Sequence, residues 1–324
     1  MPDTSRGVLV AVPTHNGAAR IPPLLRDLAG QTLDPSLMDV LVVDNGSVAG
    51  NAAAIEHSEA MRELASRYHA EVLSIEPPGL TNARIEAVRA SRREIVLFLD
   101  DDTRPDRECC ARALRSFDEP RVGVVFGRVY PEYATEPGHS IRKREGILAV
   151  NHRLGDADLT WKSPAEFAPT LGAALAVRTR AFLEAYPWRE PHRLLPDRVG
   201  TRLVSGGDLE IGQFLARAGW WRIYNPAVIV QHALDPARLR TGPFCRLILS
   251  IERSRATFEE KFGFAPSAAA RRARALAELG AILAFAPVWV FSRDGYRGWL
   301  FALASRAGRI AGAYPAARAF RSTV

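Results

Sequence analysis

Along the first 130 residues, short apolar runs alternate with segments whose apolar residues recur at helical spacing. The runs GVLVAVP and EIVLFLDDD are nearly continuous and rich in branched residues, as expected for strands buried on both faces. MDVLVVDNGS, AEVLSIEPPG and RVGVVFGRVY are of the same kind, and helices are expected at 21–28, 52–68, 80–90 and 107–117. This alternation predicts an α/β fold with a doubly wound, mostly parallel sheet flanked by helices.

The rest of the chain changes character twice. Residues 133–169 are irregular, which is typical of a binding loop. We then expect a strand leading into a helix (TLGAALAVRTRAF), a loop leading into an amphipathic helix (SGGDLEIGQFLARAGW) and two short strands ending at His232 (WWRIYNPAVIVQH). From Thr241 onward the pattern is helical, with one helix to about Phe262 and two helices rich in Ala and Arg after it. The pattern predicts an α/β domain over residues 1–238 and a helical C-terminal region over residues 239–324.

The composition is that of an ordinary globular protein, with 47% hydrophobic and 24% charged residues among 324. The net charge of +7 indicates attraction to phosphates or to an anionic membrane, although a merely solubilising surface would carry the same charge. No nucleic-acid partner is expected, because no zinc finger, aromatic RNA-binding motif or isolated basic arm occurs.

Three features bear on the compartment. Cys109, Cys110 and Cys245 form no disulfide framework and lack metal-ligand spacing, which favours a reducing compartment. The N-terminus lacks the pattern of a secretory signal. The longest apolar run, at 279–291, has thirteen residues and includes Pro287, whereas a spanning helix needs roughly twenty. We therefore expect a cytoplasmic protein without a transmembrane helix.

The strongest chemical signal is a set of three carboxylates, Asp100, Asp101 and Asp102, directly after a buried strand. Neighbouring carboxylates raise one another's pKa unless a positive charge shares the site. A Mg²⁺ or Mn²⁺ ion that bridges diphosphate oxygens would provide that charge. The alternative is a turn with helix-capping acids, which is our interpretation of Asp106.

Three further positions each have a structural and a functional interpretation. Asp208 follows two glycines at the start of a helix, where it would cap the helix or act as a general base, with Glu210 lining the site or orienting an acceptor. Asp44 ends a strand, where it would form a turn or bind a ribose hydroxyl or base N–H. His232 also ends a strand and would be structural or would contact a metal or phosphate.

In this order along residues 7–235, the motifs resemble the inverting family 2 glycosyltransferases of the GT-A fold, in the bacterial non-processive form. VAVPTHNGAARIPPLLRDLAGQ, VVDNGS, GLTNARIEAV and FLDDDTRPD are similar to the donor half of that family, and TLGAALAVRTRAF and SGGDLEIGQFLARAGW to its acceptor half. The donor nucleotide site implied by the resemblance comprises Pro13, Asn16, Asp44, Arg84, Asp100 and Asp101.

Within that implied site, Asp44 and Arg84 would hold the nucleoside and Asp100 its ribose. Asp102 would ligate Mg²⁺ or Mn²⁺, with His232 assisting at the diphosphate. The resemblance also places Gly172, Gly207 and Glu210 on the acceptor side and makes Asp208 the catalytic base.

The sequence departs from the family pattern in two places. Gly207 stands where many members of that family have Glu, and the Gln-x-x-Arg-Trp signature of processive synthases is absent. The resemblance implies inverting transfer from a nucleoside-diphosphate sugar to a hydroxyl of a glycan or of a lipid-linked acceptor, and the absence of the processive signature indicates that one sugar is transferred.

Rival functions fit less well. A nucleotidyltransferase or a dehydrogenase would need a Gly-rich phosphate loop after the first strand, where this chain has PTHNGAAR. The non-enzymatic alternative is a sugar-nucleotide-binding or membrane-binding protein with a decayed site, which the combined set of acids and His232 disfavours.

The C-terminal region combines arginines with aromatic residues. Its arginines include Arg271, Arg272, Arg274, Arg293, Arg297, Arg306, Arg309 and Arg318, interleaved with Trp289, Trp299, Leu300 and Phe301. Such helices either lie in a membrane interface or simply pack on the catalytic domain. The first interpretation predicts peripheral attachment to the inner face of the cell membrane.

Overall fold

A computed structural model describes residues 5–76, 78–195, 206–284 and 295–312. Within these residues the chain forms a nine-stranded sheet in the order β3-β2-β1-β4-β8-β6-β9-β5, with β7 pairing to β9. The strands are β1 (Ser5–Thr14), β2 (Met38–Asn45), β3 (His69–Ile75), β4 (Arg93–Leu99), β5 (Thr103–Pro105), β6 (Val122–Tyr133), β7 (Leu159–Trp161), β8 (Ala174–Arg178) and β9 (Trp221–Leu234).

The first four strands in the sheet order are parallel, as the sequence pattern predicts. Strand β8 runs antiparallel between β4 and β6, and β6 pairs with β9 in parallel. Because β1, β2 and β4 run in the same direction, their carboxyl ends meet at one edge of the sheet. In doubly wound sheets this edge is where ligands bind.

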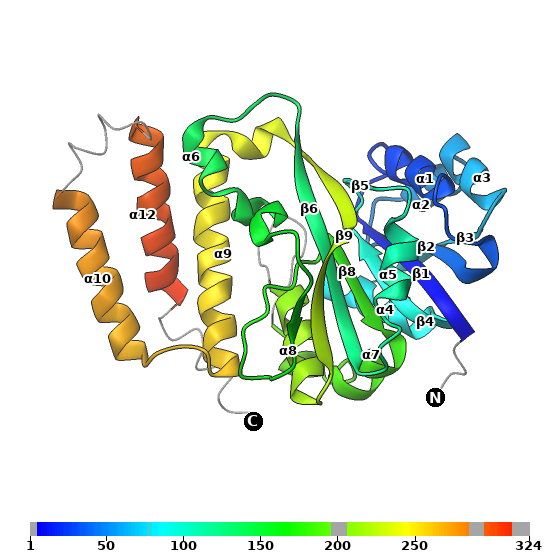
Figure 1. Cartoon of the computed structure of the whole chain (residues 1–324). Helices are drawn as coiled ribbons and strands as arrows, with labels where there is room; N and C mark the ends of the chain where they lie inside the picture. The colour runs from blue at the N-terminus through cyan, green and yellow to red at the C-terminus, as the bar shows by residue number, and fades with distance from the viewer. Residues whose placement is uncertain (1–4, 77, 196–205, 285–294, 313–324) are drawn as a thin grey trace.

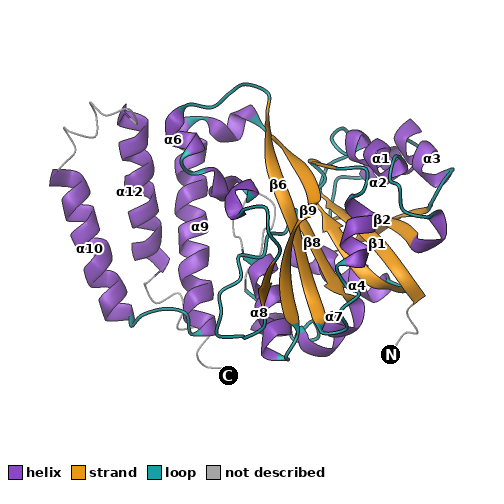
Figure 2. Ribbon diagram, in the orientation of Figure 1, coloured by secondary structure: helices purple, strands orange, loops and turns teal. Residues whose placement is uncertain are grey.

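Helices cover both faces of the sheet, and a third group stands beside it (Figures 1 and 2). The α-helices are α1 (Pro22–Ala29), α2 (Asn51–Glu56), α3 (Glu59–Ala65), α4 (Leu80–Ala90), α5 (Cys109–Arg115), α6 (His139–Arg142), α7 (Thr179–Ala185), α8 (Gly207–Arg217), α9 (Thr241–Phe262), α10 (Ala268–Ala284) and α12 (Gly295–Gly312). Short 3₁₀ turns are η1 (Pro35–Leu37), η2 (Glu145–Leu148), η3 (His152–Leu154), η4 (Pro191–Arg193) and η5 (Pro236–Leu239).

The alternation of side chains along β1 explains the two buried faces. Val8, Val10 and Val12 belong to a core that includes side chains of α1, α3 and α5. Leu9 and Ala11 belong to a second core with side chains of α4, α7 and α8. A strand that is apolar at every position therefore has apolar partners on both sides of the sheet.

Two predicted elements differ from the structure. The single helix expected at 52–68 is two helices, α2 and α3, because the Ser58 side chain accepts a hydrogen bond from the Met61 N–H and caps α3. The two short strands expected before and at His232 are one strand, β9, whose pairing with β6 shifts register between Gly127 and Arg128. The irregularity in register is accommodated within a continuous strand.

The C-terminal helices stand in a row, with α12 between α9 and α10 (Figure 1). Phe244 of α9 and Phe301 of α12 pack together, their ring centroids 4.7 Å apart. Phe258 and Phe262 of α9 pack against Leu195 and the α8 side chains Leu209 and Phe214. A separate domain over residues 239–324 stays a prediction, since α9 also packs on the α/β part of the chain.

No helix in the described ranges is long and apolar enough to cross a membrane. The apolar run at 279–291 extends past residue 284 and so lies partly outside the described residues. Trp289, Arg293 and Arg318 also lie outside them.

Candidate active site

The carboxyl ends of β1, β2 and β4 bring together most of the predicted donor-site residues. Thr14 ends β1 and is the register partner of Asp44 at the end of β2. The Thr14 hydroxyl donates to Oδ2 of Asp101 at 2.5 Å, and the Arg20 guanidinium forms an ion pair with the same carboxylate at 2.6 Å. Asp101 is thus held in place by protein groups. Neither Thr14 nor Arg20 was singled out by the sequence analysis.

The turn after β1 packs against the turn after β2. The Asp44 carboxylate is buried and accepts hydrogen bonds from the side chains of Ser47 and Asn51. Asn16 has a positive φ of 52° and joins the two turns, because its Oδ1 accepts from the Val48 N–H and its own N–H donates to Ser47. This arrangement fixes the backbone beside Asp44.

His232 lies next to the acidic cluster because of a short strand that the sequence analysis did not predict. Strand β5 pairs with β9 and makes Thr103 the register partner of His232. Nε2 of His232 consequently lies 3.3 Å from Oδ1 of Asp102. The backbone N–H of Ala233 also donates to the Asp102 carbonyl at 2.9 Å.

The pKa values of Asp100, Asp102 and His232 are perturbed by burial and by one another's charges. Burial, and then the negative charge of Asp102, raises the pKa of Asp100. Burial also acts to raise the pKa of Asp102, but the hydrogen bond and positive charge of His232, aided by nearby Arg238 and Arg20, prevail and lower it. The pKa of His232 is raised, since its bonding to Asp102 outweighs burial.

Asp102 and His232 fit the protein's share of a divalent-cation site. They offer one carboxylate oxygen, the ligand type that Mg²⁺ and Mn²⁺ prefer, and beside it one imidazole nitrogen, which ligates in its neutral form. The described residues hold no group of three or more His, Cys, Asp or Glu side chains that could bind a metal. A two-donor protein site is consistent with a cation that takes its remaining ligands from diphosphate and water.

Asp208 is the second residue of α8 and not its N-cap. The helix begins at Gly207, and Gly206 is the N-cap with a φ of 122°. Oδ2 of Asp208 accepts from the Gly172 N–H at 2.8 Å and Oδ1 from the Leu209 N–H at 2.9 Å. Both carboxylate oxygens are therefore oriented by backbone donors.

Gly172 connects Asp208 with the donor side. A Cβ at Gly172 would lie 2.4 Å from Nη2 of Arg84 and 3.3 Å from Oδ2 of Asp208. The Arg84 side chain is buried, and its positive charge acts to lower the pKa of Asp100. Its Nε atom has no hydrogen-bond partner among the described residues. A continuous set of groups thus extends from Asp208 through Arg84 to the acidic cluster.

Glu210 is directed toward the C-terminal helices. Its side chain is fully buried, and its carboxylate accepts from the Leu195 N–H at 3.1 Å and pairs with Lys261 of α9 at 2.5 Å. This pairing fastens α8 to α9. The structure does not bring the Glu210 carboxylate together with Asp208 and Gly172, and a role toward an acceptor stays a prediction.

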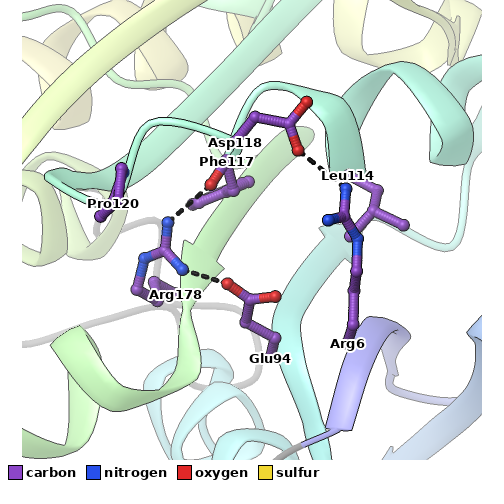
Figure 3. A pocket seen from close by; sticks show the side chains of 7 residues that line it. All are labelled: Arg6, Glu94, Leu114, Phe117, Asp118, Pro120 and Arg178. Carbon is purple, nitrogen blue, oxygen red and sulfur yellow. Dashed lines mark hydrogen bonds and ion pairs between the residues drawn. The ribbon is translucent and has the colours of Figure 1, made fainter.

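Two cavities lie outside the cluster. One of about 240 Å³ lies near the amino ends of β1 and β4, opposite the site, and its charges are paired, Arg178 with Glu94 and Arg6 with Asp118 (Figure 3). A second, of about 400 Å³, lies between α4, which carries Arg84, and the segment with Trp188 and Leu194. Of these two, only the second lies beside the helix that carries Arg84.

Comparison with known proteins agrees with this geometry. The chain is 32% identical over 140 residues to glycosyltransferase AglE of Haloferax volcanii, covering 42% of this chain and 44% of that relative. The match therefore spans less than half of the relative's length.

The fold is similar to that of the mannosyltransferase PcManGT from Pyrobaculum calidifontis, solved in complex with GDP-Man and Mn²⁺. The TM-score is 0.62 at 20% identity, with 97% of this chain and 88% of that chain covered. At this identity the likeness concerns the fold, and it confirms the mostly parallel GT-A architecture with a helical C-terminal region.

Two family models cover the candidate site. The model described as glycosyl transferase family 2 matches residues 9–172, which include Asp44, Arg84 and the acidic cluster. The model described as glycosyl transferase family group 2 matches residues 95–274, which include Asp208 and His232. The chain therefore belongs to glycosyltransferase family 2, whose members transfer a sugar from a nucleotide sugar.

Proposed function

We propose that this glycosyltransferase transfers a single sugar, with inversion, from a nucleoside-diphosphate sugar to an acceptor hydroxyl, using Asp208 as the general base. One observation carries the proposal: Gly172 contacts both the Asp208 carboxylate and Arg84, whose charge in turn acts on Asp100. The candidate base and the acidic cluster therefore belong to one continuous site, although more than 100 residues separate them in sequence.

The donor nucleotide lies at the carboxyl ends of β1 and β2. Pro13, Asn16 and Asp44 surround the nucleoside, and Asp100 accepts from a ribose hydroxyl. Arg84 supplies a buried positive charge next to Asp100, while Arg20 keeps Asp101 oriented. The GDP-Man bound to the structurally similar mannosyltransferase supports a nucleotide-sugar donor, without fixing the base or the sugar.

Asp102 and His232 would hold the divalent cation, Mg²⁺ or Mn²⁺, which would supply positive charge beside the leaving diphosphate. Arg238 lies close enough to lower the pKa of Asp102, so its guanidinium adds a second positive charge near the diphosphate. The Mn²⁺ in the similar mannosyltransferase structure supports a divalent cation here.

Asp208 receives the proton of the acceptor hydroxyl as that oxygen attacks the anomeric carbon. The new carbon–oxygen bond forms while the bond to the diphosphate breaks, and the electron pair of that bond leaves with the diphosphate. Attack opposite the leaving group inverts the configuration at the anomeric carbon. The N–H groups of Gly172 and Leu209 keep the carboxylate oriented for this role.

The acceptor is a glycan or a lipid-linked hydroxyl, which approaches from the side of Gly172 and Gly207. The expected location is the cytoplasm, with peripheral attachment to the inner face of the cell membrane. Residues 1–238 form the catalytic domain, and the helical region over residues 239–324 supports it.

The test is a panel of nucleotide sugars assayed for thermal stabilisation and for donor hydrolysis, with and without Mn²⁺. We expect one donor to stabilise the protein more with Mn²⁺ and to be hydrolysed slowly. Asp208→Asn should retain the stabilisation and lose the hydrolysis. Donor binding without hydrolysis or transfer by the unaltered protein would instead identify a sugar-nucleotide-binding protein with a decayed site.

A further inference from the structure

Helix α10 turns its apolar side outward. Its exposed residues recur at spacings of three and four along the helix, so they share one face. Leu276 and Leu283 on this face are 60% and 55% exposed. All its described exposed residues are apolar: Ala269, Ala270, Ala273, Leu276, Ala277, Gly280, Ala281, Leu283 and Ala284.

Two charged side chains of α10, Arg271 and Glu278, pair with residues of the neighbouring helices. Arg271 pairs with Glu260 of α9 at 3.5 Å, and the two side chains are only 12% and 21% exposed. Glu278 pairs with Arg306 of α12 at 2.9 Å, and both are also largely covered. A helix on the surface of a globular protein normally has the reverse arrangement, with its apolar stripe inward and its charges in water.

The region that carries this helix is also the source of the protein's positive charge. Residues 239–324 contain 14 Lys and Arg against 5 Asp and Glu, a net +9, whereas the whole chain is +7. The four described carboxylates of this region, Glu252, Glu259, Glu260 and Glu278, are partly covered and ion-paired. Every charged side chain described as exposed there is an arginine, at positions Arg240, Arg246, Arg253, Arg255, Arg297 and Arg309.

We propose that the outward face of α10 lies in the interface of an anionic lipid bilayer, with the exposed arginines of the C-terminal region near its headgroups. An exposed stripe containing two leucines is stabilised where it leaves water for the acyl-chain boundary. The positive charge adds attraction to anionic lipid, about fivefold in affinity for each basic residue near the surface. The proposal rests on the peripheral attachment proposed above and names the helix face that makes it, and it does not depend on the proposed catalysis.

A second copy of this chain fits the face less well. Association through it would bring two regions, each of net charge +9, against one another, and like charges in proximity oppose association. An anionic bilayer would remove the apolar face of α10 from water and would attract the exposed arginines to its headgroups. The position of α10 at the outer end of the row of helices leaves this face uncovered within the described structure (Figure 1).

The experiment is flotation of the full chain with vesicles of phosphatidylcholine alone or mixed with phosphatidylglycerol, at low and high salt. We expect the protein to float with the mixed vesicles at low salt and much less with the neutral ones. The variant carrying both Leu276→Glu and Leu283→Glu should lose at least tenfold in vesicle affinity, because two exposed leucines no longer enter the interface.

Val48→Glu is the matched control, since Val48 is 69% exposed but lies between β2 and α2, at the other end of the molecule (Figure 1). It should float like the unaltered protein. Melting temperature and donor hydrolysis of the double variant should be unchanged, which separates loss of attachment from loss of folding or of the proposed activity.

Three results would overturn the proposal. The unaltered chain could fail to float with either kind of vesicle, or the double variant could float as well as the unaltered chain. Light scattering could also show a dimer that the double variant converts to a monomer, which would make the face a self-association surface.

Discussion

Oδ1 of Asp102 lies 3.3 Å from Nε2 of His232, in a contact made across the paired strands β5 and β9. The Asp102 carboxylate is the ligand type that divalent cations such as Mg²⁺ and Mn²⁺ prefer, so this pair would hold the cation, which would supply positive charge beside the leaving diphosphate. The Asp102 side chain is 25% exposed and that of His232 only 3%, so a substrate can approach the pair from the side of Asp102.

Asp102→Ala should abolish transfer and the Mn²⁺-dependent part of nucleotide binding, because it removes the carboxylate donor of the pair. Isothermal titration of a nucleoside diphosphate with and without Mn²⁺ measures the second effect directly. The fold should remain intact, as judged by melting temperature, since Asp102 lies in a turn after β4. Full transfer activity in the presence of EDTA would exclude the metal from the reaction.

Gly172→Ala should weaken activity without unfolding the protein. The new methyl group would overlap Nη2 of Arg84, which is the end of a flexible side chain, so the guanidinium should move away from Asp100. Loss of a charged contact of this kind corresponds to roughly a tenfold or greater fall in kcat/KM.

The control for this substitution is Gly146→Ala, because a Cβ at Gly146 meets no atom within 4 Å. Initial rates over a range of donor concentrations compare the two variants. If Gly172→Ala and Gly146→Ala have the same kcat/KM, Arg84 does not act in the site.

The parallel half of the sheet could be predicted from sequence because strands buried on both faces appear as continuous apolar runs, and β1 and β4 are of this kind. Their carboxyl ends share an edge, so the acids that follow them could be placed in one site. The general position of the acidic cluster and of the turn at Asp44 followed from the strand pattern alone.

The remaining features depend on contacts between distant residues. Strand β5 has three residues, one of them Pro105, and is too short for a pattern of apolar residues to predict it. Its pairing with β9 nevertheless brings His232 next to Asp102. Glu210 stands two residues after Asp208, and its partner Lys261 is 51 residues further along the chain. Local patterns carry no information about such pairings, which explains why the orientation of Glu210 was not foreseen.

Glu210→Gln should destabilise the protein substantially. The Glu210 carboxylate is fully buried, and its removal leaves Lys261, itself largely covered, without its charged partner. Breaking a buried pair in this way costs about 3–5 kcal/mol. Chemical denaturation followed by circular dichroism gives the change in unfolding free energy.

Glu184→Gln is the comparison for this measurement, because Glu184 pairs with Arg180 across one turn of α7 and the Arg180 side chain is 68% exposed. Its effect should stay within about 0.5 kcal/mol. Equal effects of the two substitutions would mean that the pairing of Glu210 with Lys261 does not hold α8 and α9 together.

Asp208→Asn should reduce the transfer rate by roughly a hundredfold or more, while donor affinity and melting temperature change little. An Asn side chain retains an oxygen that can accept from the Gly172 N–H and loses only the acceptor for the Leu209 N–H. The substitution therefore keeps the contact with Gly172 and removes the ability to take a proton. A base acts only as the acceptor attacks, so turnover should suffer far more than donor binding.

The control is Asp106→Asn, since among the described residues the Asp106 carboxylate accepts from the Glu108 N–H and from Arg112 near the start of α5, away from Asp208. Single-turnover transfer rates and donor titrations on both variants decide the matter, and near-normal turnover of Asp208→Asn would remove Asp208 from the mechanism.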